Sequence, residues 1–236
     1  MPLRSLLDPV GGVPKAVESR RWVLGVVLVS VLSSASGAAV ALKVDMSSSV
    51  IDKLSMAGEL AKASEREISE AIEQMQRVSL VMGVAKGLLV MPLVVLAIGV
   101  ALKVAAWLLG RKAAFSACFT AASLAMLPLG VFHLAELVAA SRQVALTPAA
   151  AGDLVPTSLV AVWAAEAPWS RVLRALDVVN IWSSLVMGLG FAAASSWRPW
   201  KGALFGLFMY LLFAGAFLVG LPGLMGGGPG TGGPTP

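Results

Sequence analysis

The stretch from Trp22 to Leu42 holds 21 residues and no charged side chain. At about 1.5 Å per residue, a helix of that length is roughly 31 Å long, which matches the hydrocarbon core of a bilayer. Only 13% of the 236 residues are charged, and 58% are hydrophobic. A soluble fold of this size could not bury so much apolar surface. The chain is therefore predicted to be an all-α, polytopic membrane helical bundle.

Apolar runs of similar length recur along the chain and predict a single membrane domain over residues 22–222. Its five spans are expected at about 22–42, 80–110, 113–139, 178–197 and 202–221. In the head over 1–21, Pro and Gly residues favour a loop, followed by a short helix on the membrane surface. The tail over 223–236 is rich in Gly and Pro and is expected to be disordered.

A cleaved signal peptide is the alternative interpretation of the first span. A basic start, an apolar block and small residues from Ser33 to Ala39 all fit a signal sequence. However, the apolar run continues through Leu42, and the head before it is long and contains prolines. These features favour a retained span.

Residues 44–79 are richly charged, with seven acidic and four basic side chains. Ile68, Ile72 and Met75 repeat there at positions i, i+4 and i+7, so they share one face of a helix. We expect an amphipathic extracytoplasmic helix over 44–79 that extends the second span, with this face as the candidate partner surface. A second extracytoplasmic loop is expected over 141–176, with a short apolar segment at the interface.

The second span contains two lysines and a proline. Lys86 and Lys103 are separated by 16 uncharged residues and are expected to reach opposite interfaces. Pro92 lies between them and is expected to bend the helix.

Basic residues flank the spans in small groups, as they do at the cytoplasmic ends of membrane proteins. Arg111-Lys112 and the turn from Arg198 to Lys201 form two short loops on one side, and the head on that side carries four basic residues. The N-terminus is therefore predicted to be cytoplasmic and the C-terminus extracytoplasmic. No stretch interleaves basic and aromatic residues over a polar face, so nucleic-acid binding is not expected despite the net charge of +5.

A group of ionisable residues is expected near the outer interface, at the ends of the third and fourth spans. It comprises His133, Glu136, Arg142, Arg171, Arg174 and Asp177. His133 and Glu136 share a helix face and leave three interpretations open: an interfacial pair bonded to an arginine, a proton or substrate relay, and a metal site. A metal would need further ligands, and the chain has no second histidine, so no metal or cofactor is expected. Asp177 is expected to cap the fourth span.

Small residues four positions apart occur in three spans and allow helix backbones to approach closely in lipid. The pairs are Ser33 and Gly37, Gly83 and Gly87, and Gly202 and Gly206. Packing within the bundle is favoured over dimerisation. The single cysteine, Cys118, is interpreted as a small buried hydrophobe. The sequence holds no phosphate-binding glycine loop, HExxH motif or plausible Ser/His/Asp arrangement, so an enzyme is not expected.

Three stretches resemble the bacterial branch of the Yip family, five-span membrane proteins named for interacting with Ypt/Rab GTPases. They are Leu6-Leu7-Asp8-Pro9 followed by Arg21-Trp22, the run from Leu176 and Asp177 to Trp182 with Gly188 and Gly190 beyond it, and the basic turn before the last span. The resemblance implies five spans, a cytoplasmic head and, for a bacterial member, the inner membrane. Eukaryotic members reach Rab GTPases through a long head with an aspartate-leucine-tyrosine-glycine-proline type motif. The head here lacks it, so Rab binding is not expected.

Three functions are compatible with these sequence features. The leading hypothesis is a non-catalytic membrane scaffold or accessory subunit that assembles with itself or with a membrane export complex through the Ile68, Ile72 and Met75 face. The alternative is a transporter, channel or lipid-moving protein, which needs polar groups at mid-membrane depth, with Pro92 and Pro128 as candidates. The remote alternative is an intramembrane enzyme that uses His133 and Glu136. Membrane lipid surrounds the protein in every case.

Overall fold

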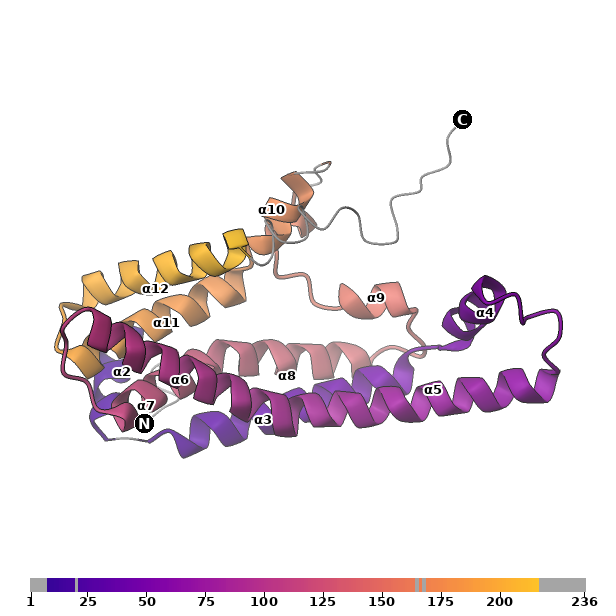
Figure 1. Ribbon diagram of the computed structural model, residues 1–236, viewed down its shortest axis with the longest axis horizontal. Coiled ribbons are helices and arrows are strands. Elements are labelled where there is room, and N and C mark those ends of the chain that lie inside the picture. Colours follow the sequence, from indigo (N-terminus) through magenta and orange to yellow (C-terminus); the bar gives the residue numbers. More distant parts are fainter. Residues whose placement is uncertain (1–7, 20, 164–165, 167–168, 217–236) are drawn as a thin grey trace. The chain divides into compact units, whose positions relative to one another are not determined.

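The computed structural model describes residues 8–19, 21–163, 166 and 169–216. These residues form helices and no strand, with two isolated β-bridges (Figure 1). Five helices in this part of the chain are long and apolar enough to cross a membrane: Val23–Lys43, Glu65–Leu108, Phe115–Ser141, Val178–Ser195 and Pro199–Ala216. The predicted all-α, five-span class is confirmed. The tail over 223–236 lies outside the described residues.

The chain divides into two compact units, and each is described by itself. The first unit takes in Met1–Trp22, Ile98–Pro128 and Pro156–Pro236. The second unit takes in Val23–Ala97 and Leu129–Val155.

The first unit is organised around α11 (Val178–Ser195), which packs against α12 (Pro199–Phe213), α7 (Phe115–Ala125) and α2 (Pro9–Glu18) (Figure 1). Gly188 of α11 crosses α12 at Gly202 and Gly206, so closely that an added Cβ would meet backbone atoms. Beyond the crossing, Phe191 is fully buried and stacks on Phe205 with ring centroids 4.6 Å apart. Small residues at the crossing therefore set the helix separation, and aromatic rings fill the space beside it.

The head forms a helix where its composition favours a loop. Pro9 occupies the first turn of α2, and the Asp8 carboxylate accepts a hydrogen bond from the Gly11 amide at 2.9 Å. Both features start helices well. Val13 and Ala16 are almost fully buried in the first unit. Burial of this face outweighs the poor helix propensity of the glycines, and the expectation of a loop between Asp8 and Pro14 was wrong.

The second unit is built on α3 (Val23–Lys43), which runs antiparallel to α5 (Glu65–Ala85) and to the π-helical turn η1 (Lys86–Val90). Gly37 meets Gly83 where α3 crosses α5, and an added Cβ on either glycine would come within 2.7 Å of the other's carbonyl oxygen. Gly87 of η1 lies against the Ser34 backbone. The small residues noted in the sequence thus lie on facing helices.

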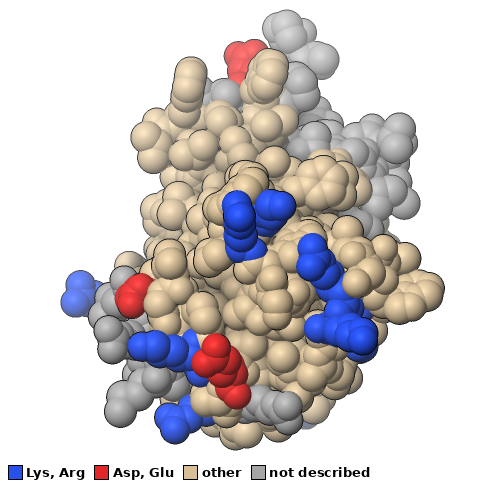
Figure 2. Space-filling view, turned by 90° about the vertical axis from the view of Figure 1, so that its left-hand side faces the viewer, with Lys and Arg blue, Asp and Glu red and all other residues tan. Residues whose placement is uncertain are grey.

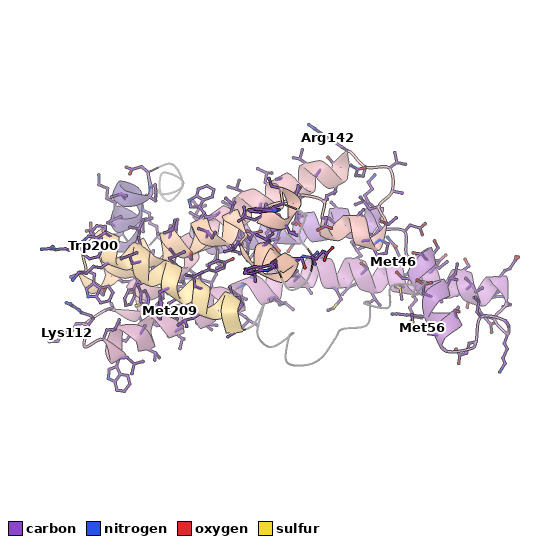
Figure 3. The ribbon with its side chains drawn as sticks, turned by 90° about the horizontal axis from the view of Figure 1, so that it is seen from above. Met46, Met56, Lys112, Arg142, Trp200 and Met209 are labelled. Carbon is purple, nitrogen blue, oxygen red and sulfur yellow. The ribbon has the colours of Figure 1, made fainter. Side chains whose placement is uncertain are left out.

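Residues 44–79 fold into two helices rather than one. Helix α4 runs over Ser47–Met56 and packs against α5, with Val50 buried between them. The break contains Gly58, whose φ of +69° suits glycine, and ends at Ser64, which forms a capping box with Glu67. Met46 and Met56 mark the two ends of α4 in Figure 3. Both the glycine and the capping box are visible in the sequence, and they explain why the single helix expected over 44–79 is divided. The expected extension of the second span by α5 is present.

Pro92 is accommodated by the π turn that precedes it. Helix α6 (Met91–Leu108) continues directly from η1, and the Met91 amide donates to the Lys86 carbonyl, five residues back. A proline cannot donate to the carbonyl four residues before it, and its ring crowds that turn. The wider π turn relieves this conflict and lets one long helix continue from Glu65 to Leu108.

Candidate functional site

A cavity of about 670 Å³ with a mixed polar and apolar lining lies within the second unit. Its walls come from α3, α5 with η1, α8 (Leu127–Ser141) and the short α9 (Pro148–Gly152). The side chains that give it polar character are Ser33, Ser36, Ser79, Lys86, His133 and Glu136. Neither Pro92 nor Pro128, the positions that the sequence suggested for a transport path, lines it.

Ser36, His133 and Glu136 form a hydrogen-bonded triad in this cavity. His133 is only 4% exposed, and its Nδ1 lies 2.7 Å from Glu136 Oε2. The Ser36 hydroxyl lies 3.3 Å from the same oxygen and 3.2 Å from Nδ1. An ionised carboxylate can only accept, so the geometry has Nδ1–H and the hydroxyl both donate to Glu136. The other ring nitrogen of His133, Nε2, has no partner in the described part of the chain.

Buried hydroxyl groups on α3 add to this polar character. Ser30 and Ser33 are 6% and 1% exposed, and neither hydroxyl has a partner among the described residues. Ser33 lines the cavity, one helical turn from Ser36. The spacing of the α3 serines is a signal that sequence reasoning missed. It predicts a polar face on α3, although not the helix that this face meets.

Of the six ionisable residues expected to cluster, the structure brings only His133 and Glu136 together. Arg142 lies exposed at the end of α8 (Figure 3), and it forms no ion pair with any described residue. Arg174 and Asp177 belong to the first unit. The side chain of Arg171 lies outside the part of the chain that the structure describes. The partner of the His133–Glu136 pair is therefore Ser36, and no arginine whose side chain is described bonds to the pair.

The residues of the family-like motif serve as helix caps and packing points in the first unit. Asp8 caps α2, and Asp177 caps α11 by accepting from the Asn180 amide at 3.0 Å. Asp177 also accepts a hydrogen bond from Thr157. Trp182 is half-buried on α11, one helical turn and a half before the Gly188 crossing. The two motif acids thus fix where helices begin.

Basic side chains gather at one end of the first unit (Figure 2). The Arg111 guanidinium lies over the Trp197 ring at 5.6 Å, and the Lys201 ammonium lies 5.5 Å from the Trp200 ring. Lys112 and Trp200 lie at the same end in Figure 3. The turns before α7 and before α12 are therefore neighbours and form one positively charged surface.

The α4–α5 hairpin presents an apolar stripe beside a groove. Ile68, Ile72 and Met75 of α5 are half-buried. A groove of about 390 Å³ between the two helices is lined by Met75 and by Val50, Lys53, Leu54, Ala71, Gln74 and Val78. Exposed i,i+4 ion pairs, Arg66–Glu70 at 2.8 Å and Glu73–Arg77 at 3.3 Å, lie elsewhere on α5.

Two carboxylates, one near the start of each helix, stabilise this hairpin. Hydrogen bonds from the Ser64 amide and hydroxyl lower the pKa of Glu67 below its usual value. Hydrogen bonds from the Ser47 hydroxyl and amide likewise lower the pKa of Asp45. Because both donors favour the ionised carboxylate, each turn is most stable when its acid is charged.

Five long apolar helices place the chain among multi-pass membrane proteins. The Yip1 domain family matches residues 3–221, and the chain therefore belongs to that family. The resemblance seen in the sequence is confirmed. Comparisons with curated proteins and with solved structures gave no match.

Proposed function

We propose that this Yip1 domain protein is a non-catalytic scaffold or accessory subunit that holds a second membrane protein through the α4–α5 hairpin. The observation that carries the proposal is the apolar stripe of Ile68, Ile72 and Met75. These side chains remain partly exposed even though α4 already packs against α5. Acidic and basic residues on the rest of α5 keep this segment in water, where an exposed apolar stripe is costly unless a partner covers it.

Helix α4 also carries exposed apolar residues. Ile51 is 42% exposed and Met56 is 85% exposed, and Val50 and Leu54 of the same helix line the apolar groove between the helices. An amphipathic helix of the partner fits such a groove through its apolar face. A partner that is itself a membrane protein would lie close to the hairpin without losing much orientational freedom, because both chains are confined to the bilayer. An export complex is the expected setting.

The basic surface of the first unit supports the orientation that goes with this role. Arg111, Lys112, Arg198 and Lys201 lie on the two short loops that the positive-inside rule weighs most. The proposed arrangement has this end and the N-terminus in the cytoplasm of a bacterial cell, and the hairpin and C-terminus outside the inner membrane. Fusions of a cytoplasm-active and a periplasm-active reporter to each terminus test it, and the same compartment for both termini would overturn it.

Site-directed crosslinking tests the scaffold role. Cys118 is fully buried and is first replaced by Ala, and a photoactivatable thiol reagent is then attached to Ile72→Cys in intact membranes. We expect an adduct with another integral membrane protein, lost when Ile68→Ser and Met75→Ser are added. Glu73→Cys, next along the helix but exposed, is the matched control and should give no adduct. An adduct with a second copy of this chain would show that the hairpin binds another copy of the same protein and not a different membrane protein. Absence of any adduct would count against the scaffold.

A lipid-moving function is the second candidate, and the cavity of the second unit favours it. Exposed residues such as Met82 and Val90 line the cavity, so it opens on the surface of the second unit. Purified protein in liposomes that carry a fluorescent phospholipid tests whether lipid crosses the bilayer. Equal rates with the protein, with Glu136→Gln and with empty liposomes would exclude this candidate.

A further inference from the structure

The cavity of the second unit contains one cationic and one anionic side chain that do not pair with each other. Lys86 comes from η1 and Glu136 from α8, and both line the cavity. No ion pair joins them within 4.0 Å, and within the described chain Lys86 has no carboxylate partner. Opposite charges held apart in an apolar bundle are costly unless a polar ligand or water lies between them.

Both charges lie about level with the middle of α3. Gly87, next to Lys86, lies against Ser34, and Glu136 accepts a hydrogen bond from Ser36. Ser34 and Ser36 stand near the centre of α3 (Val23–Lys43), a helix of 21 residues without a charge before its last position. Ionisable side chains at such a depth mark binding sites more often than structural contacts.

The rest of the cavity offers serine residues and an apolar exit. Ser36 and Ser79 also line it, whereas His133 Nε2 and Ser33 Oγ, which have no partner among the described residues, are buried and inaccessible. Lys86 is exposed at its rim, and Met82 and Val90, which also line it, are 65% and 47% exposed. The site therefore opens where acyl chains of the bilayer would contact the protein.

We propose that this cavity binds the phosphoethanolamine headgroup of a membrane phospholipid. The ammonium group donates to Glu136, and the phosphate pairs with Lys86. The acyl chains leave past Met82 and Val90 into the bilayer. The proposal goes beyond the scaffold role and does not depend on it.

The chemistry of the walls selects against other headgroups. Glu136 repels the phosphate of a purely anionic lipid such as phosphatidylglycerol, which brings no cation to pair with it. Phosphatidylcholine carries a quaternary ammonium group without an N–H, so it cannot donate to Glu136. Among the described residues no group of three His, Cys, Asp or Glu side chains gathers to hold a metal ion.

Photolabelling of the full-length protein tests the proposal. The protein is reconstituted in phosphatidylcholine vesicles with a trace of phosphatidylethanolamine that carries a diazirine in its acyl chain, and labelled peptides are mapped by mass spectrometry. We expect labelling of the segment from Ser79 to Val90, displaced by unlabelled phosphatidylethanolamine and not by phosphatidylglycerol. Equal displacement by the two lipids would overturn the proposal. Displacement by free O-phosphoethanolamine would show that the cavity binds a soluble zwitterion with the same charged groups. It would overturn the proposal that the ligand is a lipid.

Two substitutions inside the cavity and one outside it complete the test. Glu136→Gln and Lys86→Met each remove one charge, and each should lower the labelling about tenfold, since a hydrogen bond to a charged group contributes about 1.5 kcal/mol. Arg142→Gln removes an exposed charge just beyond the end of the helix that carries Glu136 and should leave the labelling unchanged. Each variant is compared at equal amounts of monodisperse protein by size exclusion. If Glu136→Gln and Lys86→Met fold and label like the parent, the headgroup does not bind here.

Discussion

The hydroxyl groups of Ser123 and Ser195 in the first unit donate to backbone carbonyls, whereas those of Ser30 and Ser33 in the second unit, like that of Ser183 in the first, have no partner among the described residues. In the first unit, Ser123 donates to the Trp22 carbonyl at 2.7 Å, and Ser195 donates to the Phe191 carbonyl at 2.7 Å. In the second unit, Ser30 and Ser33 are as deeply buried and find no acceptor among the described residues. A polar group without a protein partner is costly in a stable core, and of these residues only Ser33 lines the cavity of the second unit.

Acidic side chains lie near helix starts in both units, as Asp45 and Glu67 do in the second unit, but Glu136 is an exception. Asp8 and Asp177 in the first unit lie at helix starts and accept from backbone amides. Glu136 in the second unit lies within α8 and accepts from the side chains of Ser36 and His133. Both units thus use acidic residues near helix starts, and the second unit has in addition an acidic residue that lines a cavity.

The largest effect is expected from filling the tightest helix crossing of the first unit. Gly188→Ala places a Cβ against backbone atoms of α12, and we expect a loss of about 2 kcal/mol in the free energy of unfolding. Equilibrium unfolding in mixed micelles measures it. Gly215→Ala is the control, because an added Cβ there meets nothing within 4 Å. Equal stability of the two variants would contradict the described packing of α11 on α12.

Removal of the Asp177 cap should have the next largest effect. Asp177→Ala leaves the Asn180 amide without its acceptor, and N-cap replacements of this kind cost about 1 kcal/mol. Asp177→Asn keeps a capping oxygen and should recover most of the loss. If both variants unfold alike in the same micelles, the role of this aspartate is something other than capping.

A matched pair of serine substitutions compares the two units directly. Ser123→Ala removes a hydrogen bond and should cost about 1 kcal/mol, because the Trp22 carbonyl loses its donor. Ser33→Ala removes a hydroxyl without a protein partner and should change the free energy of unfolding by less than about 0.5 kcal/mol. A larger loss for Ser33→Ala than for Ser123→Ala, measured in detergent without lipid, would reverse the comparison.

The smallest effect is expected at the hairpin and depends on pH. The folded pKa of Glu67 is lowered below its unfolded value of 4.5, so its stabilisation is complete above that pH and is lost as the pH falls through the folded pKa. Hydrogen exchange at the start of α5, corrected for intrinsic rates, should therefore rise as the pH falls below about 4.5. Glu67→Gln keeps the side-chain acceptor and should remove this pH dependence. If hydrogen exchange in Glu67→Gln depends on pH as it does in the parent protein, the Glu67 carboxylate does not stabilise the turn.

The sequence predicts the elements of this fold better than their contacts. Charge-free runs such as Trp22–Leu42 identify spans, since a bilayer demands apolar length whatever the neighbouring helices are. By contrast, α2 depends on burial of Val13 and Ala16 against helices that are distant in sequence, and local composition does not reveal it. The candidate site was predicted in part, because His133 and Glu136 share a helix, but Ser36 lies almost a hundred residues away.

The π turn at Lys86–Val90 changes the angular phase of the long helix. An α-helix advances about 100° per residue, so one extra residue in a turn rotates everything before it relative to everything after it by that angle. The side chains of α5 and those of the first turns of α6 can therefore face independent directions around the helix axis, although the helix is continuous. Loss of a single residue within Lys86–Val90 would leave the composition of the span almost unchanged and would turn the hairpin and its stripe toward a different neighbour.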